Sequence, residues 1–296
     1  MTLSRKGLIG YSAGVLTGVT YGTNPLMAKP LMADGTAVET ILFYRYAIAV
    51  AILGLFFVIK RQHIAVGLRQ AGVLLVAGLL YTSSSLMLFL AYEHIASGVA
   101  TTLVFLSPVI VALIMMFCGK IPSVPVWIAI AASFIGVMIM SGITDGSSQT
   151  DYLGICLAIG SAVAYSFFMV IINRSKTIAP ISSTVLTFYT LVVGTAVFFF
   201  IAMTSGSGLT AGLNHASAWL NLTGLAVVPT IISTASLAVA TRNIGATKAS
   251  ILEVFEPITA ILIGAVAFGE PITFSIIAGI TISVAAVTYM IAATAR

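Results

Sequence analysis

Two carboxylates stand inside an otherwise apolar stretch of the chain, the segment ILEVFEPITAIL at residues 251–262. Glu253 and Glu256 are three positions apart, so on a helix their side chains share one face. Neither has a basic residue three or four positions away in that segment. Carboxylates without a nearby cation are candidates for taking up and releasing a proton. Glu256 is the better candidate because it lies deeper in the apolar segment.

The composition decides what surrounds these carboxylates. Of the 296 residues, 59% are hydrophobic and only 7% are charged, and the mean hydropathy is +1.14. Such a chain has too few polar residues to cover a water-soluble globule, which predicts a polytopic membrane protein. An ionised side chain near the bilayer centre costs roughly 2.5–3.5 kcal/mol. Both carboxylates should therefore face protein or water, although solvation at the membrane surface explains Glu253 equally well.

Apolar runs recur along the whole chain, each of roughly 20 residues and therefore long enough to cross a ~30 Å hydrocarbon core. They predict an all-α protein with ten transmembrane helices, at 7–27, 37–59, 71–92, 96–117, 124–142, 152–172, 181–203, 218–239, 248–268 and 273–293.

The basic residues predict the orientation of these helices, because cytoplasmic loops carry an excess of Lys and Arg. The two termini and the even-numbered loops hold Arg5, Lys6, Lys60, Arg61, Arg69, Lys120, Arg174, Lys176, Arg242, Lys248 and Arg296. The odd-numbered loops hold only Lys29. Both termini are therefore expected in the cytoplasm. The net charge of +5 follows from this distribution and implies no nucleic-acid partner.

The two halves of the chain resemble each other. A displacement of 144 residues sets GVTYGT (18–23) on AVAYSF (162–167), and a displacement of 149 sets Pro108 on Pro257. The chain therefore divides into repeats at 1–148 and 149–296. Because five helices is an odd number, the second repeat must enter the membrane from the opposite side. Inverted repeats are the geometric basis of alternating access around a site near the midplane, which favours transport.

The segment EPITAILIGAVAFGE (256–270) resembles the repeat signature of the drug/metabolite transporter superfamily, in its EamA-type ten-helix branch. The first-half copy, SPVIVALIMMFCGK (107–120), departs from it, because Ser107 replaces the leading Glu. Arg45 resembles an arginine that the family carries in its second helix. The resemblance implies export of amino acids and other metabolites across the bacterial inner membrane, with the broad or aromatic amino acid exporters as the most similar type. It also implies that the predicted third, fourth, eighth and ninth helices form the cavity walls.

Arg45 lies about eight residues into its predicted helix, which at ~1.5 Å per residue places it about 12 Å deep. Glu256 is about as deep from the other side of the membrane. We therefore expect the two to pair across the bundle. Alternatively, Arg45 binds a substrate carboxylate through a two-point contact. Both roles are compatible with an alternating cycle.

Pro108 and Pro257 occupy matching positions in the two repeats. A proline has no backbone N–H to donate to the residue four positions earlier, so Val104 and Glu253 should keep free carbonyls and the helices should kink. The matching positions predict two hinges that line the transport path.

Four glycines spaced four residues apart, from Gly10 to Gly22, predict that the first helix approaches a neighbour closely. Further polar side chains near mid-membrane are candidates for substrate contact. They are Tyr21, Tyr81, Ser84, Thr101 and Tyr165.

Other classes of function find less support. An enzyme is not expected, because the three histidines fall in predicted loops and no residues have the spacing of a catalytic or metal site. No nucleotide-binding loop is present, so no cofactor is expected. Cys118 and Cys156 fall near opposite membrane faces and should not pair. The alternatives that remain are a membrane-embedded enzyme acting on a lipid-borne substrate and a passive channel. The expected partners are a small-molecule substrate and the lipid bilayer.

Overall fold

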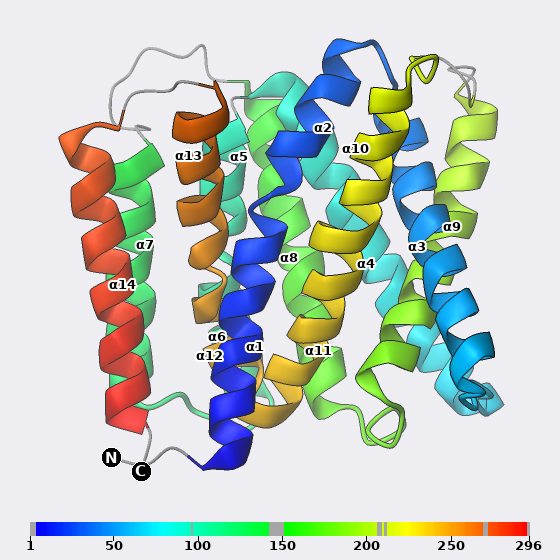
Figure 1. The fold of residues 1–296 in the computed structure, drawn as a ribbon. Coiled ribbons are helices and arrows are strands. Elements are labelled where there is room, and N and C mark those ends of the chain that lie inside the picture. Colours follow the sequence, from blue (N-terminus) through cyan, green and yellow to red (C-terminus); the bar gives the residue numbers. More distant parts are fainter. Residues whose placement is uncertain are drawn as a thin grey trace.

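The structure is a computed structural model that describes residues 4–95, 97–141, 151–205, 209, 212–268 and 272–294. Every regular element of these residues is a helix, and the helices run side by side as one bundle (Figure 1). They are α1 (Arg5–Tyr21), α2 (Asn24–Ala33), α3 (Val38–Lys60), α4 (Leu68–His94), α5 (Ser97–Val104), α6 (Ser107–Phe117), α7 (Val124–Ser141), α8 (Tyr152–Arg174), α9 (Ser183–Thr204), α10 (Ala216–Ala226), the π-helical turn η2 (Val227–Ile232), α11 (Ser233–Ile244), α12 (Ala246–Leu252), α13 (Phe255–Phe268) and α14 (Phe274–Thr294).

The predicted all-helical, polytopic fold is confirmed. Seven segments of the described residues are long and apolar enough to cross a membrane: α3, α4, α8, α9, α14 and the stretches Ala216–Ile244 and Ala246–Ala267. The other predicted spans contain shorter helices, which are α1 with α2, α5 with α6, and α7. The prediction of the first span, at 7–27, was wrong in detail. This span breaks after Tyr21, and α2 continues to Ala33, so Lys29 lies in a helix rather than in a loop.

The direction of the helices fits an inverted duplication. In Figure 1 α1 begins and α14 ends at the same end of the bundle, whereas α8 begins at the opposite end. The first helices of the two halves therefore run antiparallel. The predicted boundary between the halves, at 148/149, lies outside the described residues and stays a prediction.

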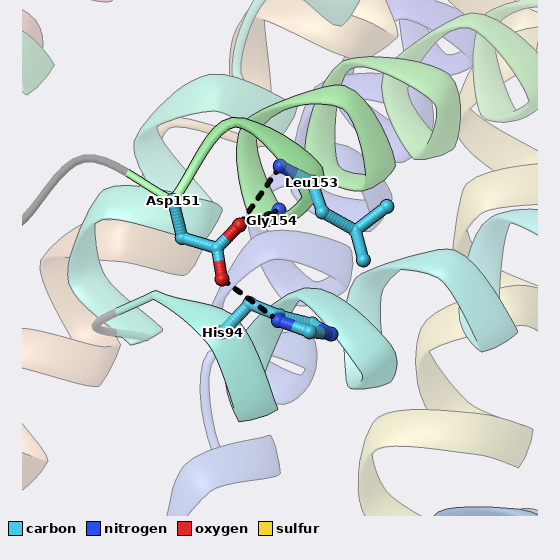
Figure 2. Close-up of polar contacts among 4 residues, drawn as sticks. All are labelled: His94, Asp151, Leu153 and Gly154. Carbon is cyan, nitrogen blue, oxygen red and sulfur yellow. Dashed lines mark hydrogen bonds and ion pairs between the residues drawn. The ribbon is translucent and has the colours of Figure 1, made fainter.

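An ion pair joins the two halves at the end of the bundle where α8 begins. His94, the last residue of α4, contacts Asp151, which caps the N-terminus of α8 (Figure 2). The prediction that all three histidines lie in loops is therefore wrong for His94. Gly154 lets the two helices approach here, because a Cβ at this position would lie 2.8 Å from the Cβ of His94.

The two prolines mark breaks in the helices, as predicted. The span with Pro108 is interrupted between Val104 and Ser107, and the span with Pro257 between Leu252 and Phe255. Each proline therefore lies in the first turn of a new helix, where its missing N–H costs no hydrogen bond.

The predicted free carbonyls were wrong, because local groups replace the missing proline N–H. The Ser107 hydroxyl donates to the carbonyl of Val104 over 2.6 Å. The backbone N–H of Glu256 donates to the carbonyl of Glu253 over 2.8 Å. Both breaks are thus hydrogen-bonded locally, one by a side chain and the other by the backbone.

Glycines set how α1 packs, as their spacing predicts. A Cβ at Gly14 would lie 2.3 Å from the Leu252 side chain, and one at Gly22 would lie 2.5 Å from the carbonyl oxygen of Glu256. Helix α1 therefore lies directly against the break between α12 and α13.

The outer surface of the bundle is apolar, with side chains such as Phe117 and Val266 about nine-tenths exposed, as contact with lipid requires.

Candidate functional site

A pocket lies inside the bundle between α1, α4, α5, α8 and the two helix breaks. It is lined by Tyr21, Ser84, Leu88, Thr101, Val104, Phe105, Ser107, Ser161, Tyr165, Glu253, Glu256 and Pro257. Its free space takes about one water molecule. The pocket therefore has no room for a larger molecule in this conformation.

Most of the site residues predicted from the sequence meet in this pocket. Six of the eight substrate or pathway candidates line it, together with one of the two predicted hinges: Tyr21, Ser84, Thr101, Tyr165, Glu253, Glu256 and Pro257. Arg45, Tyr81 and Pro108 do not line it. Tyr81 lies nearby, because its ring centre is 6.5 Å from that of Tyr165, and its hydroxyl shares a hydrogen bond of 2.9 Å with Thr234.

The carboxylates differ in their partners. Glu253 is 6% exposed and lies in the turn between α12 and α13, and its Oε1 accepts a hydrogen bond from the hydroxyl of Tyr165 on α8. Among the described residues, neither Oε2 of Glu253 nor the carboxylate of Glu256 forms a hydrogen bond or an ion pair. Both ends of this contact therefore belong to the second half of the chain, on α8 and on the turn between α12 and α13, while the other oxygen of Glu253 and both oxygens of Glu256 keep no partner among the described residues.

The predicted pair between Arg45 and Glu256 is wrong for this conformation. Arg45 is completely buried on α3, where its Nε donates to Thr230 Oγ1 and its Nη2 donates to the carbonyl of Pro229 over 3.2 Å. The only ion pair among the described residues is the one between His94 and Asp151.

The π-helical turn explains why Arg45 is held at this place. Pro229 has no N–H for the carbonyl of Leu225, and the Thr230 hydroxyl donates to that carbonyl instead over 2.6 Å. The widened turn leaves the Pro229 carbonyl and the Thr230 oxygen as acceptors for the guanidinium. Aromatic rings surround the guanidinium carbon, with centres 5.7–5.9 Å away, and they belong to Tyr21, Tyr46 and Phe89. Arg45 thus contacts the ring of Tyr21, which lines the pocket, but does not line the pocket itself.

Hydroxyl groups make up the rest of the polar lining. Ser84 Oγ and Ser161 Oγ are 3.0 Å apart, and the Ser161 hydroxyl also donates to the carbonyl of Ser84 over 2.8 Å. Ser161 was missed in the sequence. Its position one helical turn before Tyr165, on the same face of the helix, is the signal that could have found it.

The glycines of α1 position the second carboxylate. A Cβ at Gly18 would lie 2.9 Å from the Cβ of Phe255 and 3.1 Å from the backbone nitrogen of Glu256. Together with the contact of Gly22 at the Glu256 carbonyl, this places the backbone of Glu256 against α1 without an intervening side chain. The backbones that carry Tyr21 and Glu256 are consequently in close contact.

Within the described parts of the chain, no three His, Cys, Asp or Glu side chains lie close enough together to hold a metal ion. Cys118 and Cys156 are both free and exposed. The side chains that give the pocket its polar lining carry carboxylate, phenol and hydroxyl groups.

Comparisons with known proteins agree with this architecture. The model of the EamA-like transporter family matches the chain twice, over residues 8–142 and 152–292. The uncharacterized transporter sll1319 of Synechocystis sp. is 26% identical over 220 residues, which cover 69% of this chain and 62% of that protein. An uncharacterized transporter of Archaeoglobus fulgidus is 25% identical over 270 residues, which cover 91% of this chain and 92% of that protein.

A protein of known crystal structure has the same fold, with a TM-score of 0.78 at 17% identity over 98% of this chain and 99% of that one. The two family matches cover most of the sequence and coincide with the two halves that run in opposite directions. The chain therefore belongs to the EamA-like transporter family.

Proposed function

We propose that this family member exports small metabolites, above all amino acids, outward across a bacterial inner membrane by alternating access. One observation carries the proposal. The two equivalent helix breaks, at Val104–Ser107 and at Leu252–Phe255, line the same pocket. Broken helices that meet at a buried site are the usual construction of a binding site between inverted repeats.

In the proposed cycle, the bundle rocks between inward-open and outward-open states about Pro108 and Pro257. Each break lets half of a span move while the other half stays packed, because few backbone hydrogen bonds cross it. The contracted pocket suits an intermediate between the two open states, since it takes about one water molecule. Both termini lie in the cytoplasm in this proposal, which the distribution of Lys and Arg supports.

Glu256 is the proposed site of proton coupling. Its carboxylate lines the pocket and forms no ion pair with another described residue, so a change in its protonation alters the charge that a ligand meets. Tyr21, Arg45, Tyr81, Ser84, Thr101, Tyr165 and Glu253 are the proposed pathway residues around it.

The test uses the purified chain in liposomes, with uptake and exchange measured against preloaded amino acids. A carrier gives saturable exchange, a passive channel gives flux without exchange, and an enzyme acting on lipid gives a modified lipid and no flux. Absence of flux for every metabolite tested would refute the proposal. Glu256→Gln should remove the pH dependence of exchange, and the exposed Glu93→Gln should leave it unchanged. An unchanged pH dependence in Glu256→Gln would exclude this residue as the proton site.

A further inference from the structure

The charged groups that line the pocket are all acidic. Of its described lining residues, Glu253 and Glu256 carry ionisable carboxyl groups, and none is Lys, Arg or His. The remaining polar atoms belong to hydroxyl groups and to the two tyrosines, Tyr21 and Tyr165. When both carboxyl groups are ionised, this lining attracts a positive charge and repels a negative one.

The nearest guanidinium does not neutralise the carboxylates by direct contact. Two nitrogens of Arg45 donate to Thr230 and to the Pro229 carbonyl, and the ring of Tyr21 lies against its guanidinium carbon. Among the described residues, Arg45 has no ion pair with either carboxylate. Its remaining nitrogen, Nη1, is buried and has no hydrogen-bond partner among the described residues, but Arg45 is not among the residues that line the pocket.

The carboxylates have room for one more partner. Glu253 is 6% exposed, and only its Oε1 is occupied, by the hydroxyl of Tyr165. Its Oε2 and both oxygens of Glu256 lack a partner among the described residues, while both side chains line the pocket. Buried carboxylates without a cation are costly, so the arrangement requires a positively charged partner or a proton.

We propose that the carboxylates of Glu253 and Glu256, with the rings of Tyr21 and Tyr165, form a site for the positively charged nitrogen of the substrate, an organic ammonium group. This assignment rests on the proposed function, since it names the chemical group by which the pocket recognises the transported substrate. Carboxylates accept the N–H bonds of an ammonium group, and tyrosine faces attract the same cation. An inorganic cation is less suited, because the described residues offer only two carboxylates here and no cluster of metal-ligating side chains. The amino group is then the required feature, and a substrate carboxylate is not.

The test compares matched compounds that share a side chain and differ in charge. For leucine these are the amino acid itself, 3-methylbutylamine without the carboxylate, and 4-methyl-2-oxopentanoate without the amino group. A second set is built in the same way from phenylalanine. Binding to the purified full-length protein is measured by calorimetry and by the ligand-induced shift in melting temperature. We expect the amines to bind in at least one set and the oxo acids to bind in neither.

Variants separate recognition from folding. Glu253→Gln and Glu256→Gln should each weaken amine binding by roughly tenfold or more, whereas the exposed Glu93→Gln should leave it unchanged. The melting temperature of each variant without ligand shows whether it is folded. A folded Glu256→Gln variant that binds amines as tightly as the native protein would overturn the proposal.

The remaining outcomes are equally decisive. Binding of oxo acids, binding of amino acids without amines, or stabilisation by sodium alone without any amine would overturn the assignment. Amine binding without transport of any amino acid would support the ammonium site and refute amino acid export.

Discussion

Nδ1 of His94 lies 2.9 Å from Oδ2 of Asp151, and the other oxygen of the same carboxylate caps the next helix. Asp151 Oδ1 accepts the backbone N–H groups of Leu153 over 2.9 Å and of Gly154 over 3.4 Å (Figure 2). One carboxylate therefore fixes the end of α4, in the first half, to the beginning of α8, in the second. The contact stands just before α5, which lines the pocket.

Two substitutions of Asp151 should distinguish the contribution of the ion pair to stability from that of the helix cap. Asp151→Asn keeps a side-chain oxygen for the N–H groups of α8 but loses the charge, whereas Asp151→Ala loses both. We expect the melting temperature to fall more in the alanine variant than in the asparagine variant. Equal melting temperatures for the two variants would show that the cap contributes nothing.

The same carboxylate should make stability depend on pH. The hydrogen bond from His94, followed by that from the Leu153 N–H, holds the pKa of Asp151 below its usual value. A lower pKa in the folded state means that the stabilisation is complete above about pH 4 and is lost as the pH falls through the folded-state pKa. The difference in melting temperature between the native protein and Asp151→Asn should therefore change as the pH falls below about 4. A constant difference down to pH 3 would contradict this.

Arg45→Lys should destabilise the protein although the charge is kept. A lysine has no fork of donors to reach both Thr230 and the Pro229 carbonyl, so at least one buried acceptor loses its partner. We expect the free energy of unfolding in mixed micelles to fall by about 1–3 kcal/mol. The exposed Arg69→Lys is the matched control and should change it little. Equal stability of the two variants would show that the fork geometry is unimportant.

Gly22→Ala tests the close approach of α1 to the carboxylate-bearing span. Its Cβ would lie 2.5 Å from the Glu256 carbonyl oxygen and 2.7 Å from the Thr259 Cβ, so the helices must move apart. We expect a loss of about 1–3 kcal/mol of stability, together with slower exchange in liposomes. Gly72→Ala in α4 meets nothing within 4 Å and should be neutral or slightly stabilising. Exchange at the native rate in Gly22→Ala would show that this contact does not position Glu256.

Tyr165→Phe removes the hydroxyl that donates to Glu253 and keeps the ring. Loss of this donor leaves a buried carboxyl oxygen without its partner, and we expect the free energy of unfolding to fall by about 1–3 kcal/mol. Tyr152→Phe, at a 78% exposed position, is the control. Chemical unfolding of both variants measures the loss in free energy of unfolding. Equal losses in the two variants would show that another donor replaces the Tyr165 hydroxyl at Glu253.

Local patterns predicted much of this fold and site. The apolar runs located the helices, Pro108 and Pro257 located the breaks, and Glu253 with Glu256 pointed to the pocket. These features follow from hydrophobicity and backbone chemistry that are visible within one span. Within the matched halves, even Tyr165 could be identified from its equivalence to Tyr21.

What the sequence did not reveal depends on contacts between distant spans. The partner of Arg45 is Thr230, 185 positions away, at a π-helical turn that Pro229 creates after a long regular helix. Nothing in the residues around Arg45 distinguishes this partner from Glu256, because both lie in the opposite half at comparable depth. The break at Gly22–Thr23 was missed although a local signal is present, because Pro25 stands in the first turn of α2 as Pro108 and Pro257 stand in the first turns after their breaks.

The two helix breaks have a consequence for the energetics of the cycle. One break carries Ser107, whose hydroxyl donates across the break to the carbonyl of Val104, and the other carries the carboxylates. If the two halves exchange conformations, the arrangement of the helices is preserved, but the carboxylates remain at only one of the two breaks. In the proposed cycle, the inward- and outward-facing states are therefore related by the pseudo-two-fold symmetry of the repeats but unequal in free energy, and the membrane potential would act on that difference whenever the span with Glu253 and Glu256 moves.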